Sequence, residues 1–298
     1  MQPISPIAPN EVDTLRDAAV MLERDNFELA LKLMVMAHRA RPDGAFINAK
    51  LQEYREHEKV QTMVKSGALA IIPAGFRCHT RMNLAKALGL SQVSLPFDSG
   101  FFPPSSIASV LKTRQVALKF PDPNRSTHQV CIKNDNERRD NRRGINFRTS
   151  SYEEINSLVR DRNQPNINSL LDATFGYYTL DKANGFVLAH YNWHQFAGEK
   201  LSKGVRQPEL NIPNINQTLN NRIERMFDMC DRAQKIIFVV SREQFCDFMA
   251  IDDDVYNLDD IEPIRDAVAQ IFGERAIVVE LHEIDTAHKL LNRIAQVS

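Results

Sequence analysis

The residue with the clearest capacity for chemistry is Cys78, the last residue of the segment IIPAGFRC at positions 71–78. An apolar strand followed by a glycine turn would deliver this cysteine to the start of a helix near His79. The unpaired N–H groups and the positive dipole end of a helix N-terminus favour a thiolate, and Arg77 and Arg81 add positive charge. A thiolate is the nucleophilic form, so we predict a catalytic cysteine, with Arg77 and Arg81 as candidate substrate-binding residues. The alternative is a small buried residue that closes a helix against a sheet, as most free cysteines do.

Several pieces of the sequence around and beyond Cys78 resemble a bacterial family of papain-like cysteine peptidases of unknown function. In chain order they are GxxCxxR at 75–81, LGL at 88–90, SLPFD at 94–98, GFVLAH at 185–190 and RIERMF at 222–227, ahead of an apolar run at 235–240. The resemblance covers roughly residues 68–281 and implies a papain-like arrangement with Cys78 as nucleophile and His190 as base. The family has Trp after its PFD and Asp after its His, where this chain has Ser99 and Tyr191. The third catalytic residue is therefore left open.

A cysteine nucleophile needs a base within hydrogen-bond reach, and the base needs a group that orients it. His190 ends an apolar strand, so its side chain can face the rim of the sheet where the Cys78 helix begins; a histidine at a strand end can equally be structural. Asn192, two residues further, would share a strand face with His190 and is one candidate orienting group. Asp98 is the other, although its carboxylate can equally hold its own loop through backbone N–H groups. His194 would replace His190 as base in a different strand register.

The first 66 residues read as a helical extension. Apolar residues recur at helical spacing in segments 12–23 and 27–40, and a third helix begins at Ala45, after the turn around Pro42. The spacing of Asn26-Phe27, Ala30-Leu31, Ala37 and Pro42 resembles a tetratricopeptide unit. A lone unit of that kind cannot bury its apolar face, so it should pack on the rest of the chain or on a protein partner. A plain helical hairpin is the alternative.

Residues 67–298 alternate between short apolar runs and amphipathic stretches, which predicts an α/β domain with a central sheet flanked by helices. Expected strands are 68–73, 116–120, 186–190, 235–240 and 276–281; expected helices are 81–88, 152–160, 215–230, 260–272 and 287–296, with Gly273 as a helix cap. The stretch from 235 to 296 reads as a parallel βαβ unit. Catalytic residues are then expected at the carboxyl ends of the strands.

Composition narrows the function classes. The 298 residues carry 37 basic and 38 acidic side chains, a balance that argues against nucleic-acid binding. Four cysteines with no CxxC spacing argue against a disulfide scaffold or a zinc site and favour a cytoplasmic protein. We expect no signal peptide and no transmembrane segment. The Asn-, Asp- and Arg-rich segment 121–150 reads as a surface loop, either solvated or anion-binding.

The leading hypothesis is a papain-like cysteine enzyme that needs no cofactor or metal. Cys78 would attack an amide or ester carbonyl of a peptide or small-molecule substrate, and water or another acceptor would resolve the acyl-enzyme. A hydrolase and an acyltransferase would use the same residues. Trp193 is a candidate for shaping a substrate pocket and equally a core residue.

Two alternatives stay open. Asp252 to Asp254 have the D-x-D spacing with which sugar-handling enzymes of surface-polysaccharide metabolism hold a divalent metal, although three acids are more often a solvated turn. The other alternative is a non-catalytic protein that presents its N-terminal helices to a partner. The departures at Ser99 and Tyr191 favour that reading.

Overall fold

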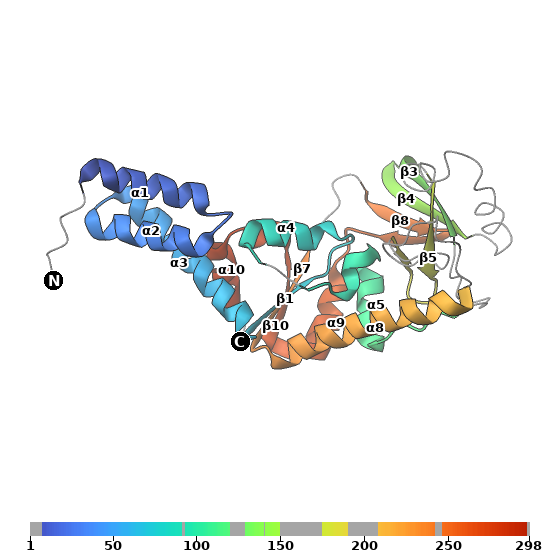
Figure 1. Cartoon of the computed structure of the whole chain (residues 1–298). Coiled ribbons are helices and arrows are strands. Elements are labelled where there is room, and N and C mark those ends of the chain that lie inside the picture. Colours follow the sequence, from blue (N-terminus) through green and yellow to red (C-terminus); the bar gives the residue numbers. More distant parts are fainter. Residues whose placement is uncertain are drawn as a thin grey trace.

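The computed structural model describes residues 8–90, 93–119, 129–139, 141–149, 175–189, 208–241 and 246–296. These residues form a mixed α/β structure, as the sequence predicts. Figure 1 shows the N-terminal helices, a parallel sheet and a second sheet following one another along the molecule. None of the helices in the described ranges is both long enough and apolar enough to cross a membrane.

Three helices make up the N-terminal part: α1 (Pro9–Leu22), α2 (Phe27–Ala40) and α3 (Ala45–Lys65). Helix α2 starts where expected because the Asn26 side chain accepts a hydrogen bond from Leu29 N at 3.1 Å, an N-cap. The helices share an apolar cluster that includes Ala19, Met34 and Leu51. The predicted helices are therefore confirmed, whereas the tetratricopeptide-like identity stays a prediction.

Helix α3 belongs to both parts of the molecule. Its first half buries Ile47, Leu51 and Tyr54 against α1 and α2, while Val60 near its end lies in the core of the α/β part. The helical extension is thus joined to the rest through a continuous helix rather than a linker.

The central sheet has three parallel strands in the order β1–β7–β10. They are β1 (Leu69–Pro73), β7 (Lys235–Val240) and β10 (Ala276–Glu280), and Ile237 of β7 pairs with Ile71 on one side and Ile277 on the other. Five of the six residues of β7 are buried. Such a continuous apolar run is what a parallel strand covered on both faces requires.

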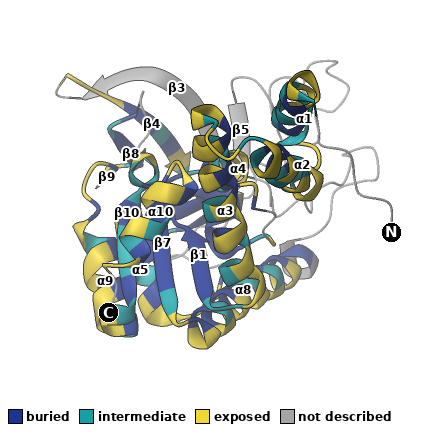
Figure 2. Ribbon diagram, turned by 90° about the vertical axis from the view of Figure 1, so that its left-hand side faces the viewer, coloured by how far each residue is buried: buried dark blue, intermediate teal, exposed yellow. Residues whose placement is uncertain are grey.

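Helices cover both faces of this sheet, and alternate residues of the strands serve the two faces. Ile236 and Phe238 pack with α5 (Pro104–Thr113), α8 (Pro208–Arg232) and α9 (Glu262–Phe272). Ile237 and Val239 pack with α3, α4 (His79–Leu88) and α10 (Ala287–Ile294). Figure 2 shows the buried strands between helices whose outer sides are exposed. The prediction of a sheet flanked by helices is confirmed for these strands.

A second sheet, which the sequence analysis did not foresee, has the order β2–β6–β5–β3–β4–β8–β9. Its strands are β2 (Gly100–Phe101), β3 (Gln129–Arg139), β4 (Arg142–Thr149), β5 (Phe175–Asp181), β6 (Phe186–Leu188), β8 (Phe248–Ile251) and β9 (Asp254–Asn257). Strands β2 to β6 lie between β1 and β7 in the chain, whereas β8 and β9 lie between β7 and β10. The predicted βαβ unit is therefore present, but between β7 and β10 the chain also forms β8 and β9, which belong to the other sheet.

Two sequence predictions are wrong in this region. Segment 121–150 is not one loop, because 129–139 and 142–149 form β3 and β4. In β4, Ile145 and Phe147 are buried, Asn146 between them is half-buried and Arg148 after them is exposed, a period of two that the high charge content obscured. The expected strand at 116–120 is also wrong for residues 116–119, which form an irregular extended segment. The expected helix 152–160 lies outside the described residues.

Side-chain amides of α8 replace the missing strand partner of this extended segment. Asn220 accepts a hydrogen bond from Val116 N at 2.8 Å and donates one to Val116 O at 2.9 Å. Asn216, one turn earlier, does the same for Leu118, at 2.9 and 2.8 Å. The backbone N–H and C=O groups of the buried residues Val116 and Leu118 therefore all have hydrogen-bond partners, although this segment pairs with no neighbouring strand.

We expect Asn220→Ala to lower the free energy of unfolding by about 1–3 kcal/mol, because both backbone groups of Val116 lose their partner. Urea denaturation monitored by circular dichroism would measure the change. The matched control is Asn221→Ala, an exposed neighbour on the same helix that makes the same gain in helix propensity. Equal denaturation midpoints for the two variants would contradict the amide pairing.

His57 on α3 lies at the joint between the helical extension and the α/β part. Its ring is 4.6 Å from the Phe27 ring, centroid to centroid, and a Cβ on Gly89 would come within 2.7 Å of its Nε2. Gly89, with φ of 59°, ends α4 in the left-handed conformation. Burial lowers the pKa of His57, against the smaller opposing effect of Glu53 and Glu23.

A histidine whose pKa is lowered on folding stabilises the fold above its ordinary pKa of about 6.5, and that contribution is lost as the pH falls toward the lower folded value. We therefore expect the free energy of unfolding to fall between about pH 7 and pH 5, and His57→Gln to flatten that slope. Urea denaturation at several pH values tests this. A slope that is the same in His57→Gln as in the wild type would contradict this assignment.

Candidate functional site

The candidate site lies where the parallel strands β1 and β7 end. The chain leaves β1 at Pro73, and Ala74 N donates a hydrogen bond to Val239 O at 2.8 Å, which ties the following turn to β7. The turn leads through Gly75 to α4, while β7 runs directly into Ser241. Because both strands point the same way, the start of α4 and Ser241 meet at the carboxyl edge of the sheet.

Cys78 is the N-cap residue of α4, as the sequence predicts, and its side chain is half-buried. The thiol makes no capping hydrogen bond to the helix. The other two cysteine side chains that the structure describes, Cys230 and Cys246, are buried. Burial raises the pKa of Cys230 to about 12, and Cys246 Sγ donates to Phe248 O. Cys78 is thus the accessible thiol of this described set.

Three polar side chains gather beside Cys78. Ser241 Oγ lies 2.5 Å from Thr80 Oγ1 and 3.3 Å from His79 Nε2. Thr80 is buried, whereas His79 and Ser241 are half-buried. A Cβ on Gly75 would overlap Thr80 Oγ1, so the turn can pass this cluster only with glycine at that position.

This Ser241–Thr80–His79 cluster was missed by the sequence analysis. The available signal was the position of Ser241 directly after the most apolar strand, which places it at the edge where catalytic residues of parallel sheets lie. Chemically, the serine hydroxyl fixes the orientation of the His79 ring and can share a proton with it. The arrangement therefore places an oriented imidazole on the residue next to Cys78.

Asp98 and Arg81 hold the SLPFD segment against α4. Asp98 Oδ2 accepts a hydrogen bond from Leu95 N at 2.8 Å in a capping box of the short helix η1 (Pro96–Ser99). Arg81 Nη1 lies 3.5 Å from Asp98 Oδ2 and donates to Ser94 Oγ at 2.9 Å. Burial raises the pKa of Asp98, while the Leu95 N–H and the charges of Arg81 and Arg222 act in the opposite direction. Of the two roles left open for Asp98, these contacts are those of loop support.

Arg77 connects the cysteine turn to the second sheet. Its guanidinium lies 4.9 Å from the Phe101 ring centroid and 5.6 Å from that of Phe76. Phe76 O also accepts a hydrogen bond from Phe102 N at 3.0 Å. The residue predicted to bind substrate is thus also packed over two aromatic rings.

Three of the predicted site residues, His190, Asn192 and Trp193, lie outside the described residues, as does His194. The described chain nevertheless runs to Ala189, which packs in the same apolar cluster as Phe76. This follows from strand pairing, since Leu188 of β6 pairs with Gly100 and Val187 with Phe101. The residue before His190 and the residue two before Cys78 therefore share one cluster.

The D-x-D segment forms the tight turn between β8 and β9, where Ile251 pairs with Asp254. Asp252 has φ of 53° and accepts hydrogen bonds from Thr149 N at 2.9 Å and Thr149 Oγ1 at 2.8 Å; Lys182 Nζ lies 3.5 Å away. Both of its carboxylate oxygens are used in joining β8 to β4. In the described ranges, no group of three or more His, Cys, Asp or Glu side chains could hold a metal ion.

Comparison with protein-family models, with curated proteins and with solved structures gives no significant match to this chain.

We expect Asp98→Asn to leave the alkylation rate of Cys78 within about twofold of the wild type, because an amide oxygen still accepts from Leu95 N. Asp98→Ala removes that acceptor and should lower the free energy of unfolding by about 1–3 kcal/mol. Mass spectrometry of alkylated peptides and urea denaturation measure the two effects. A large loss of Cys78 reactivity in the folded Asn variant would instead assign Asp98 to the catalytic group.

Proposed function

We propose that this protein is a cysteine-nucleophile enzyme of acyl transfer, a hydrolase or an acyltransferase acting on an amide or ester, with Cys78 as the nucleophile. One observation carries the proposal. The Cys78 thiol stands half-buried at the start of α4, at the carboxyl edge of the parallel sheet, and is not used as a helix cap. A helix N-terminus favours the thiolate form, and a neighbouring imidazole can accept the thiol proton.

The reaction would proceed in two steps. Cys78 Sγ attacks the carbonyl carbon while a base accepts the thiol proton, and that proton passes to the departing amine or alcohol as the carbon–nitrogen or carbon–oxygen bond breaks. Water or another acceptor then attacks the thioester, and the free thiol is regenerated. Backbone N–H groups at the first turn of α4 are suited to donate hydrogen bonds to the carbonyl oxygen as it becomes negative.

Two histidines are candidates for the base. His190 is favoured by the family order and by Ala189, which packs against the apolar cluster that contains Phe76. His79 is favoured by its contact with Ser241, since an Nε2–H donated to Ser241 Oγ makes Nδ1 the proton-accepting atom of the ring. The two assignments predict different variants to be inactive, so one series of measurements separates them.

The test is the rate of iodoacetamide alkylation of each cysteine at pH 7, read by peptide mass spectrometry. We expect Cys78 to react about tenfold or more faster than a free cysteine peptide, because the thiolate is the reacting form. Cys230 should react slowly in the folded protein, because burial keeps its thiol protonated and inaccessible.

The variants His190→Ala and His79→Ala identify the base, and Ser241→Ala reports on the orientation of His79. The variant of the true base should return Cys78 to the rate of the free peptide, while His282→Ala, at an exposed histidine, serves as control. A wild-type Cys78 that reacts no faster than the free peptide would overturn the cysteine-enzyme proposal. The remaining hypothesis would then be a non-catalytic protein that binds a partner through its N-terminal helices.

A further inference from the structure

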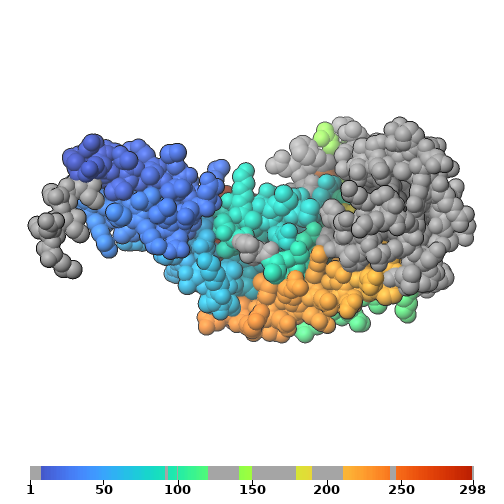
Figure 3. All heavy atoms as spheres, in the orientation of Figure 1, coloured from blue at the N-terminus to red at the C-terminus, as the bar shows by residue number. Residues whose placement is uncertain are grey.

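A groove of about 680 Å³ lies between the helical extension and the α/β part, away from Cys78. One wall is formed by the end of α1, the start of α2 and the middle of α3. The other is formed by the last turns of α4 and the segment from η5 (Leu281–Glu283) to Asp285. Its volume is in the range of ligand-binding pockets in proteins. Figure 3 shows that the N-terminal helices and the α4 segment meet along this side of the molecule.

The acidic side chains that line the groove are already paired with lysines. Lys50 Nζ lies 3.0 Å from Glu23 Oε2 and 3.0 Å from Glu53 Oε2, and Glu23 also accepts a hydrogen bond from Tyr54 at 3.0 Å. Asp285 Oδ1 lies 2.9 Å from Lys289 Nζ. These carboxylates therefore have little remaining capacity to bind a cation.

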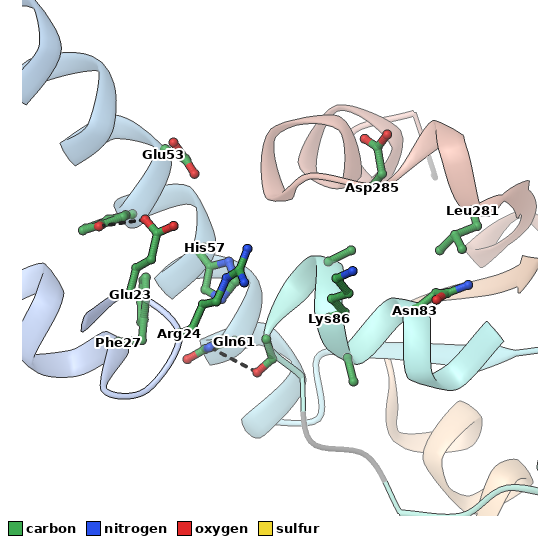
Figure 4. A pocket seen from close by; sticks show the side chains of 14 residues that line it. Glu23, Arg24, Phe27, Glu53, His57, Gln61, Asn83, Lys86, Leu281 and Asp285 are labelled. Carbon is green, nitrogen blue, oxygen red and sulfur yellow. Dashed lines mark hydrogen bonds between the residues drawn. The ribbon is translucent and has the colours of Figure 1, made fainter. Parts of the chain in front are cut away.

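The two cationic side chains that line the groove, Arg24 and Lys86, are not held in ion pairs of this kind by the described residues. Arg24 and Lys86 are exposed, and neither forms an ion pair with any residue in the described part of the chain. Figure 4 shows them on facing walls, Arg24 beside His57 and Lys86 on α4. The charge of Arg24 also acts on the pKa of neighbouring Glu23, which it lowers, but both cations stay exposed to the groove. Two exposed cations across a groove favour an occupant with more than one negative charge.

The groove also has an aromatic wall. Phe27 is half-buried at the start of α2, with its ring 5.5 Å from the Tyr54 ring and 4.6 Å from the His57 ring. Such a surface accepts an apolar or aromatic side chain on the wall that also carries Arg24. A ligand that matches the groove thus combines carboxylates with an aromatic group.

From these observations we infer that the groove binds an acidic peptide segment, with its carboxylates on Arg24 and Lys86 and an aromatic side chain against Phe27. This is a binding function distinct from the chemistry of Cys78. Helix α4 carries Cys78 at its N-terminal end and Lys86 in its last turn, so the helical rise separates the two residues by about 12 Å.

The test is isothermal titration calorimetry of the full chain with the acetylated, amidated peptide Glu-Glu-Phe-Glu-Glu. We expect the Arg24→Gln/Lys86→Gln double variant to bind about tenfold more weakly, which is the loss of two exposed charge contacts. The matched control is Arg39→Gln/Lys112→Gln, which removes exposed cations from the last turns of α2 and α5, outside the groove. Its affinity should equal that of the wild type.

Two further peptides sharpen the result. The counterpart with Gln in place of every Glu should bind about tenfold more weakly to the wild type, and the difference should shrink at high salt. A peptide with Leu in place of Phe should bind more weakly, because it lacks the ring that packs against Phe27. Absence of binding at millimolar peptide, or equal affinity for the Glu and Gln peptides, would overturn the inference. Because the alkylation test of Cys78 does not involve this groove, failure here leaves the proposed enzyme function unaffected.

Discussion

Strand β7 is paired on both edges by parallel strands, and the position of nearly every functional element follows from that pairing. It holds β1 and β10 in register, so that Ile71, Ile237 and Ile277 form one row. Its alternate side chains bind two separate helical layers. Because parallel strands end at the same edge, the turn after β1 and the residue after β7 are brought together. The contact of Ser241 with Thr80 and His79 is a direct product of this arrangement.

The second sheet depends on the same pairing, since it is assembled from two excursions of the parallel unit. One excursion supplies β2 to β6 and the other supplies β8 and β9, and the parallel pair β4–β8 joins them. Asp252 reinforces that junction through Thr149. At the boundary between the two sheets, Phe76 lies among residues of the second sheet while Ala74 is bonded to β7. The turn that delivers Cys78 is thus held from both sides.

The sequence was a good guide wherever local pattern and tertiary packing agree. Helix α2 begins at Phe27 because Asn26 is a good N-cap, and β7 is recognisable because a fully covered parallel strand must be apolar throughout. The position of Cys78 at the start of a helix was also predictable from the local sequence pattern of apolar strand, glycine turn and helix. The failures arise where the decisive partner is far away in sequence. The segment that begins at Val116 is apolar enough to be a strand. Its backbone, however, forms hydrogen bonds with the side chains of Asn216 and Asn220, and no local sequence pattern reveals these partners.

The candidate site shows the same division. Cys78 could be found from its own turn, whereas the His79–Ser241 contact joins residues that are adjacent only after β7 has paired with β1. Strand β4 was missed because its exposed arginines mask the alternation of Ile145 and Phe147. Asp98 was identified from its motif, but its hydrogen bond from Leu95 N depends on the loop geometry, which the sequence does not reveal.

The separation of β1 from β7 along the chain also bears on how the protein forms. Leu69 pairs with Lys235, so the chain must pass through all of β2 to β6 and α8 before β1 gains its neighbour. Pairings between such distant segments carry a large loop-closure cost and slow folding. During synthesis the three N-terminal helices emerge early and can pack on one another. Strand β1 stays unpaired until β7 has been made. The turn around Cys78 therefore takes its final form late, and a chain that stops before β7 would hold the cysteine without the edge that places it.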